Sequence, residues 1–66
     1  MRILLNGQTR EIPDGLTVRE LLVHLDFSEG PVAVERNRDV VPKVRHAEVR
    51  VQEGDSIEIV HFVGGG

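Results

Sequence analysis

The chain has 66 residues, which is enough for one small domain with a single thin core but not for an internal cavity of enzyme size. Hydrophobic residues make up 39% and charged residues 29%, with both signs interspersed, which is typical of a soluble globular domain rather than a disordered one. Eleven acidic and eight basic side chains give a net charge of −3 without a Lys/Arg cluster, so the composition argues against nucleic-acid binding.

Two absences from the sequence narrow the chemistry and the location. The chain contains no cysteine, which excludes a disulfide, a thiolate nucleophile and a cysteine-based metal site. Its apolar runs are far shorter than the ~20 residues that span a bilayer, and its first residues lack the apolar core of a signal peptide. We therefore expect a cytoplasmic protein without membrane association that is a monomer on its own.

The first predicted element is a β-hairpin. Residues 2–5 are mostly aliphatic, and Asn6-Gly7 follows as a strong two-residue turn signal because both positions tolerate positive φ. Residues 9–12 then form the second strand. This pattern predicts that the chain opens with two antiparallel strands.

A capping box predicts the start of a helix. Thr17 fits the N-cap, and Glu20 fits the N3 position whose side chain reaches back to the cap. The apolar residues that follow have the i, i+3, i+4, i+7 spacing of one buried helical face, namely Val18, Leu21, Leu22 and Leu25. A helix with one apolar face is expected to cover a sheet.

The second half of the chain reads as strands and turns. Residues 32–36 are rich in β-branched side chains, residues 40–41 fit a short strand, and residues 56–63 fit the final strand. Residues 48–51 are a weak strand candidate. Residues 43–47 are expected to be irregular or to form one helical turn.

This order of elements predicts an α+β fold of the β-grasp (ubiquitin-like) class, with one helix packed across a mixed sheet of four to five strands. A ferredoxin-like fold would need a second helix with apolar periodicity, and the sequence shows none. We assign residues 1–63 to a single β-grasp domain and residues 64–66 to a flexible C-terminal glycine tail.

The glycines Gly64, Gly65 and Gly66 are the candidate reactive site. Because glycine has no Cβ, Gly64 and Gly65 are expected to thread a narrow channel in a partner. The carboxylate of Gly66 is ionised at neutral pH, so an adenylating enzyme could direct it at the α-phosphate of ATP. The acyl-adenylate could then pass to sulfide or a persulfide, giving a thiocarboxylate, or to an amine, giving an isopeptide bond. A frayed terminus and a cloning remnant are the alternatives.

The last strand predicts a partner-binding surface beside this tail. If its isoleucines face the helix, the alternate residues face away from it, and we assign Glu58, Val60, Phe62 and Val63 to this surface. Exposed apolar side chains next to a reactive arm can anchor a partner. The alternative is that they are ordinary isolated surface residues.

The sequence contains no pattern typical of an enzyme active site. His24, His46 and His61 lack the i, i+4 spacing of a helical metal site, and the glutamates are spread singly among basic neighbours. We therefore expect a protein that is not an enzyme and that binds neither a metal nor a cofactor itself. The role of His61 stays open.

Four parts of the sequence together resemble a known family, namely residues 17–22, residues 32–37 with 40–43, residues 54–60 and the glycine ending. They resemble the sulfur-carrier proteins of thiamin biosynthesis (ThiS type), which are bacterial ubiquitin-like proteins. The match spans almost the whole length, and the Gly65-Gly66 terminus is its strongest single element. The sequence departs from the family at His46, where many members carry a tryptophan before the alanine, and this bears on the packing of that loop.

The resemblance implies a role in sulfur transfer. Gly66 would be adenylated by an ATP-dependent, ubiquitin-activating-like enzyme and converted to a thiocarboxylate with sulfur from a donor protein. Thiazole synthase would then receive the sulfur and build the thiazole ring of thiamin. Of the functional residues of the family, Gly65 and Gly66 carry over to this sequence.

Other functions remain open at the level of the sequence. The small subunit of molybdopterin synthase is similar in fold and ending but typically longer. Carriers of sulfur for cysteine or for a thiolated tRNA base would differ only in their partner enzyme. A protein modifier that is joined to lysines and a β-grasp binding module with an idle tail are the candidates from other classes.

Overall fold

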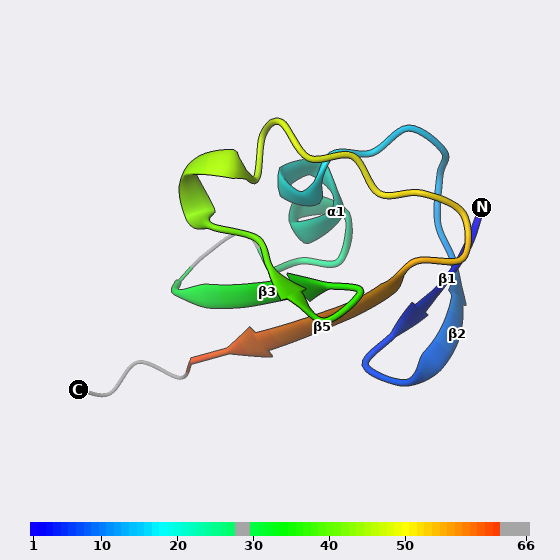
Figure 1. Cartoon of the computed structure of the whole chain (residues 1–66), viewed down its shortest axis with the longest axis horizontal. Helices are drawn as coiled ribbons and strands as arrows, with labels where there is room; N and C mark the ends of the chain where they lie inside the picture. Colours follow the sequence, from blue (N-terminus) through cyan, green and yellow to red (C-terminus); the bar gives the residue numbers. More distant parts are fainter. Residues whose placement is uncertain (28–29, 63–66) are drawn as a thin grey trace.

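The structure is a computed structural model that describes residues 1–27 and 30–62. The described elements are β1 (Arg2–Leu5), β2 (Gln8–Glu11), α1 (Val18–His24), β3 (Val32–Arg36), β4 (Asp39–Val40), the 3-10 helix η1 (Lys43–Arg45) and β5 (Ser56–His61). The strands form one sheet in the order β2-β1-β5-β3-β4, and α1 packs across one face of it (Figure 1). This is the predicted β-grasp arrangement.

The sheet is mixed because its first and last strands run parallel. β1 pairs with β5 in parallel, whereas β1–β2, β3–β5 and β3–β4 are antiparallel pairs. β5 therefore occupies the centre of the sheet, between β1 and β3. β1 pairs only with Ser56 and Ile57 at the start of β5, whereas β3 pairs with β5 as far as His61, so β3 supports the end of the strand.

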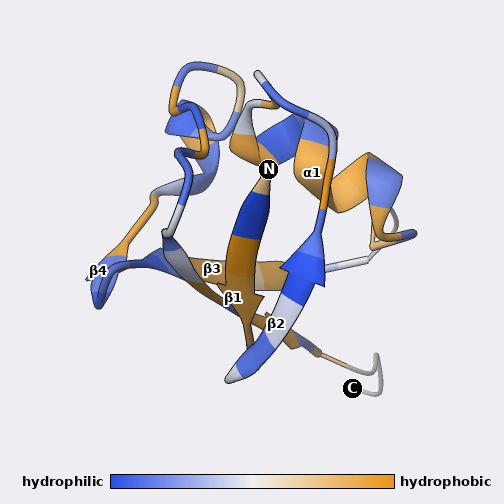
Figure 2. Cartoon of the chain, turned by 90° about the vertical axis from the view of Figure 1, so that its right-hand side faces the viewer, coloured by the Kyte–Doolittle hydropathy of each residue, from blue (hydrophilic) through white to orange (hydrophobic). Residues whose placement is uncertain are grey.

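The opening hairpin forms around the predicted turn. Asn6 and Gly7 have φ values of +50° and +83°, as a tight hairpin turn requires. β1 carries the hydrophobic residues that face the core, whereas β2 is largely hydrophilic (Figure 2). The second strand is Gln8–Glu11 rather than residues 9–12; Ile12 follows it, is buried in the core and donates its N–H to the carbonyl of Met1 at 2.8 Å.

The predicted capping box is confirmed at the start of α1. Thr17 Oγ1 accepts the Glu20 N–H at 3.1 Å, and the Glu20 side chain accepts the Thr17 N–H at 2.8 Å. These two bonds satisfy donors that the first helical turn leaves without partners. The helix buries the side chains of Val18, Leu21 and Leu22 in the core.

Two strand predictions in the second half need correction. Residues 48–51 are not a strand of the sheet: this segment lies beside the start of α1, where Val18 donates to the Val49 carbonyl and Val51 donates to the Leu16 carbonyl, both at 2.9 Å. The short strand β4 begins and ends one residue earlier than predicted, because Val41 turns into the core.

Two further predictions about the second half hold. The expected helical turn within residues 43–47 is present as η1. β3 has the predicted bounds. The predicted last strand, residues 56–63, begins at Ser56 as predicted, but β5 ends at His61 and Phe62 lies outside it; residue 63 falls outside the described residues.

The core lies between the sheet and α1. Its largest fully buried side chains come from β1, α1, β3 and β5, namely Ile3, Val18, Leu21, Val34 and Ile57. The described part of the chain contains no helix that is long and apolar enough to cross a membrane.

Candidate functional site

The central strand β5 is held at its start and along its length by two asparagine side chains from distant turns. Asn6 accepts the Ile59 N–H at 2.8 Å and donates to the Ile59 carbonyl at 3.3 Å. Asn37 accepts the Ser56 N–H at 2.9 Å, and its own N–H donates to the Ser56 carbonyl at 2.8 Å. Both asparagines have positive φ, which this residue tolerates better than most. The turns after β1 and after β3, the two neighbours of β5, therefore both bond to β5, the strand that precedes residues 63–66.

A buried carboxylate fixes the turn that leads into β5. Asp55 accepts hydrogen bonds from Arg36 Nε at 2.6 Å, from Asn37 Nδ2 at 3.0 Å and from the Gln52 N–H at 2.7 Å. Burial by itself would raise the pKa of Asp55, but these three donors and the charge of Arg36 outweigh burial and lower the pKa below its ordinary value. The ionised carboxylate thus ties β3 and the turn after it to the start of β5.

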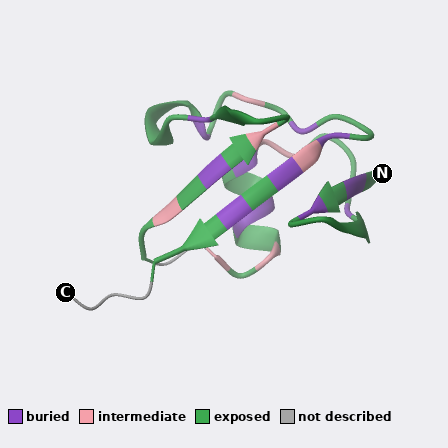
Figure 3. Cartoon of the chain, turned by 60° about the horizontal axis from the view of Figure 1, so that its bottom comes forward, coloured by how far each residue is buried: buried purple, intermediate pink, exposed green. Residues whose placement is uncertain are grey.

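The predicted alternation of β5 is present in the structure. Ile57 and Ile59 are buried against the helix, while Glu58 is exposed and Val60 is 54% exposed. Figure 3 shows this alternation of buried and exposed residues along β3 and β5. Phe62, just after β5, is 53% exposed and so is not a core residue. The predicted surface residues that the structure describes are therefore open to a partner.

The sheet register adds a feature that neither strand reveals alone. Glu58 on β5 lies directly opposite Glu35 on β3, and Val60 lies opposite Ala33. Like charges that face each other across two strands are unfavourable. Neither glutamate forms an ion pair within residues 1–27 and 30–62. The outer face of the sheet therefore holds an acidic pair without a described cationic partner.

Exposed apolar side chains lie on the same sheet as this acidic pair. Leu4 on β1 and Val40 on β4 are both exposed, and Val40 lies opposite Glu35 in the register. Together with Glu35, Glu58 and Val60 they form what we call the outer-face patch. The sequence does not single out Glu35, since only the strand pairing brings it beside Glu58.

The end of β5 also packs against the loop after α1. The Phe62 N–H donates to the Pro31 carbonyl at 3.0 Å, and the rings of Phe27 and His61 meet edge to face with centroids 5.6 Å apart. Gly30 has a φ of +80°, and a Cβ there would lie 3.2 Å from His61 Nε2. The backbone hydrogen bond, the ring contact and the glycine thus fix the end of β5 against the loop after α1.

The remaining predicted site residues fall outside the part that the structure describes. These are Val63, Gly64, Gly65 and Gly66. The three histidines lie apart: His24 ends α1, His46 follows η1 and is buried, and His61 ends β5. Within the described ranges, no group of three or more His, Asp or Glu side chains is arranged to hold a metal ion.

Comparison with known proteins assigns the chain to a family. The model of the ThiS family matches residues 3–66. The chain belongs to the ThiS family. A crystal structure of the thiamine biosynthesis protein ThiS from Geobacter metallireducens superposes with a TM-score of 0.85 at 32% identity and covers the whole of both chains. The predicted family and the predicted β-grasp fold are both confirmed.

The relatives of this chain include short carrier proteins and thiazole synthases about five times as long. The chain is 38% identical to the sulfur carrier protein ThiS of Escherichia coli over the whole of both proteins, and 46% identical to that of Bacillus subtilis over 76% of each. It is also 46% identical to a thiazole synthase of Paramagnetospirillum magneticum over all 66 residues, although it spans only 20% of that protein. A thiazole synthase of Magnetococcus marinus matches similarly, at 47% identity. The chain thus spans about a fifth of the length of these two relatives. The names of the two short relatives agree with the prediction of a carrier rather than an enzyme.

Proposed function

We propose that this chain is a sulfur carrier in thiamine biosynthesis and that the carboxylate of Gly66 carries the sulfur. The observation that supports this most strongly is the ThiS family match, which runs from residue 3 through the terminal glycines to residue 66. The full-length match to a protein named as a sulfur carrier supports the same role. The chain binds no cofactor itself, and ATP is consumed by its activating enzyme.

The chemistry proceeds in two transfers. The Gly66 carboxylate attacks the α-phosphate of ATP on an adenylating, ubiquitin-activating-like enzyme, and pyrophosphate leaves. Sulfide supplied by a sulfur donor protein then attacks the acyl carbon, and AMP leaves with the bonding electrons, giving a thiocarboxylate. Glycine at positions 64 and 65 allows the tail to pass a channel that admits only backbone.

Thiazole synthase is the proposed acceptor of the sulfur. Two relatives that carry this name contain a segment 46–47% identical to the whole of this chain within a protein about five times as long. Two domains of one polypeptide are held at high effective concentration, which favours binding between proteins that act in successive steps. This supports thiazole synthase over acceptors that make molybdopterin, cysteine or a thiolated tRNA base.

The outer-face patch supports docking to a partner that supplies a basic side chain. Val60, with the half-exposed Phe62 beside it, offers apolar area, and the facing Glu35 and Glu58 lack a described cationic partner. A partner arginine placed between the two carboxylates would relieve their repulsion and form charge-assisted hydrogen bonds. Binding of the adenylating enzyme would thus stabilise an arrangement that is unfavourable in the free chain.

Intact mass spectrometry tests the carrier chemistry. The chain is incubated with ATP, a sulfur donor and the adenylating enzyme of its host, and its mass is measured before and after. We expect the gain of one oxygen-to-sulfur exchange, located in the C-terminal peptide. The Gly66→Ala variant is the matched control and should show impaired transfer with an unchanged fold. An unchanged mass for the natural chain would refute the proposal.

Three substitutions test the docking surface. Phe62→Ala should weaken binding to the adenylating enzyme with little change in melting temperature, because the side chain is half exposed. Glu58→Gln should also weaken binding while slightly raising stability, by about 0.2–1 kcal/mol, since it removes a like-charge pair. Glu48→Gln makes the same charge change beside Arg45, away from the patch, and serves as the control. Equal affinity of the Glu58 and Glu48 variants would contradict the proposed contact.

A further inference from the structure

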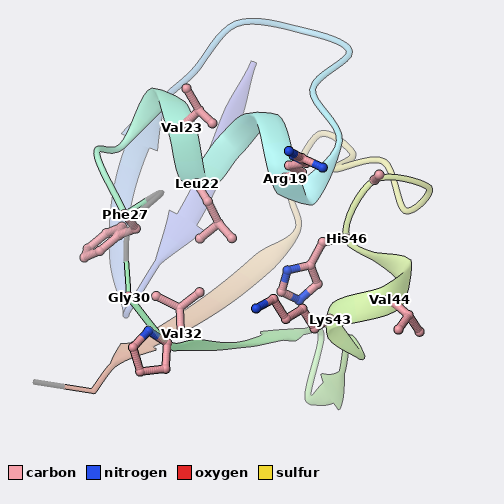
Figure 4. A pocket seen from close by; sticks show the side chains of 11 residues that line it. Arg19, Leu22, Val23, Phe27, Gly30, Val32, Lys43, Val44 and His46 are labelled. Carbon is pink, nitrogen blue, oxygen red and sulfur yellow. The ribbon is translucent and has the colours of Figure 1, made fainter. Parts of the chain in front are cut away.

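A groove lies on the helix side of the molecule, away from the outer-face patch. It has a volume of about 560 Å³ and runs between α1 and the segment around η1. Leu22, Phe27 and Val32 provide an apolar lining, and Figure 4 shows the side chains of Leu22 and Val32 directed toward each other across the groove. The exposed side chains of Val23 and Val44 also line the groove, and we call these two residues its rims.

The charge of the groove is opposite to that of the chain as a whole. Arg19 from α1 and Lys43 from η1 line it, and none of its described lining residues is acidic, although the chain carries a net charge of −3. Neither cation has an ion pair within residues 1–27 and 30–62. By contrast, Arg45 in the same 3-10 helix pairs with Glu48 at 3.5 Å. The two groove cations are therefore available to an incoming acidic group.

The position of Arg19 is not explained by the stability of its helix. It lies in the first turn of α1, where the helix dipole disfavours a cation. The acidic residue of that turn, Glu20, is occupied by the capping box with Thr17. Arg19 thus contributes a positive charge to the groove without a structural role that the fold itself requires.

Both rims of the groove carry apolar side chains in solvent. Val23 on α1 is 60% exposed and Val44 on η1 is 86% exposed, and η1 buries none of its residues. A pocket for a small molecule usually encloses most of its ligand, whereas these valines would be covered only by a larger partner. The rims therefore favour a protein segment as the occupant.

Hydrogen bonds of His46, which itself lines the groove, hold the wall that carries Lys43 in place. The His46 ring is buried, and its Nε2–H donates to the Val41 carbonyl at 3.0 Å, while the His46 carbonyl accepts the Arg19 N–H at 2.9 Å. These bonds connect α1 to the segment after η1 and fix the width of the groove. A groove that is already formed loses less entropy on binding than one that must be ordered.

We propose that this groove binds a segment of a partner protein in which acidic and apolar side chains alternate. The carboxylates of the segment pair with Arg19 and Lys43, and its apolar side chains cover Val23, Val44 and the lining. None of the outer-face patch residues lines the groove, so a partner bound in the groove leaves that patch accessible. This inference does not depend on sulfur chemistry at Gly66.

Amide NMR with short probe peptides tests the inference on the full chain. The acidic probe repeats Ser-Leu-Glu, one control probe replaces each glutamate by lysine, and a second control replaces each leucine by serine. We expect the acidic probe to shift the amides of Arg19, Val23, Val44 and their neighbours in the groove. The lysine and serine controls should cause no shifts there.

Matched variants test which residues carry the binding. The double variant Arg19→Glu, Lys43→Glu should lower the affinity for the acidic probe about tenfold. Arg10→Glu with Arg38→Glu changes the net charge equally at exposed sites outside the groove and should leave affinity unchanged. Amide spectra of both double variants verify that each is folded.

The apolar rim has its own pair of variants. Val44→Ser should lower the affinity for the acidic probe, whereas Val40→Ser on the outer face should leave this affinity unchanged. Shifts that map to the outer-face patch, equal binding of the lysine probe, or equal weakening by the two double variants would overturn the proposal. Probe-independent dimerisation through the groove, seen by sedimentation, would also overturn it, because the occupant would then be a second copy.

Discussion

Removal of the Asn6 side chain should destabilise the attachment of the central strand β5 to the turn after β1. This side chain bonds both backbone groups of Ile59, which is 53 positions away in the sequence. Asn6→Gly keeps the positive φ of the turn and deletes only the side chain, so it isolates these two bonds. The variant therefore measures how firmly β5, the base of the proposed reactive tail, is fixed in the sheet.

The magnitude follows from the geometry of the two bonds. The 2.8 Å bond from the Ile59 N–H is well formed, and the 3.3 Å bond to its carbonyl is longer and contributes less. At about 0.5–1.5 kcal/mol for each bond, Asn6→Gly should lower the free energy of unfolding by about 1–2 kcal/mol. A domain of this size has a total stability of about 3–10 kcal/mol, so the loss is a substantial fraction. The melting temperature should fall by about 4–16 °C.

Two companion variants separate the side-chain bonds from the backbone. Asn6→Ala should be less stable than Asn6→Gly by about a further 1 kcal/mol, because alanine does not readily adopt positive φ. Asn6→Asp retains the acceptor for the Ile59 N–H and loses the donor to its carbonyl, so its stability should lie between those of the natural chain and the glycine variant.

Circular dichroism in urea is the appropriate assay, since the chain contains neither tryptophan nor tyrosine for fluorescence. Amide hydrogen exchange of Ile59 provides a local readout and should be faster in the glycine variant. Unchanged stability together with unchanged exchange at Ile59 would refute the reasoning that Asn6 holds β5.

Three further predictions concern residues that shape the fold. The pKa of Asp55 is lowered in the folded state below its ordinary value of 3.8. The stability that Asp55 contributes is therefore present at pH values above 3.8 and is lost as the pH falls through the folded pKa. Urea titrations at several pH values should show that the stability of Asp55→Asn depends less on acid. Thr17→Ala should cost about 1 kcal/mol by calorimetry, because it removes the cap of α1. Arg38→Gly should instead stabilise the chain by about 1 kcal/mol in the same measurement, since Arg38 has a φ of +73°.

Function could be predicted only in part from the sequence. The glycine ending and the family resemblance pointed to a carrier, and the ThiS family match agrees with them. The roles of Gly64, Gly65 and Gly66 and the boundary between residues 63 and 64 stay predictions, because they lie outside the described residues. The groove could not be predicted, since its lining comes from segments that are separate in the sequence and carry no motif.

Local signals in the sequence determined the hairpin, the capped helix and the alternation of β5. The Asn6-Gly7 turn, the Thr17 capping box and the spacing of isoleucines each act between residues a few positions apart, so a single segment contains all the information. The fold class followed from the order of these elements.

Tertiary structure alone decided which distant residues meet. Only the register of β3 on β5 brings Glu35 opposite Glu58, and only the packing beside α1 diverts residues 48–51 from the sheet. The physical reason is that strand pairing and side-chain burial are settled between segments far apart in the chain, where the free energy depends on the whole core rather than on any local pattern.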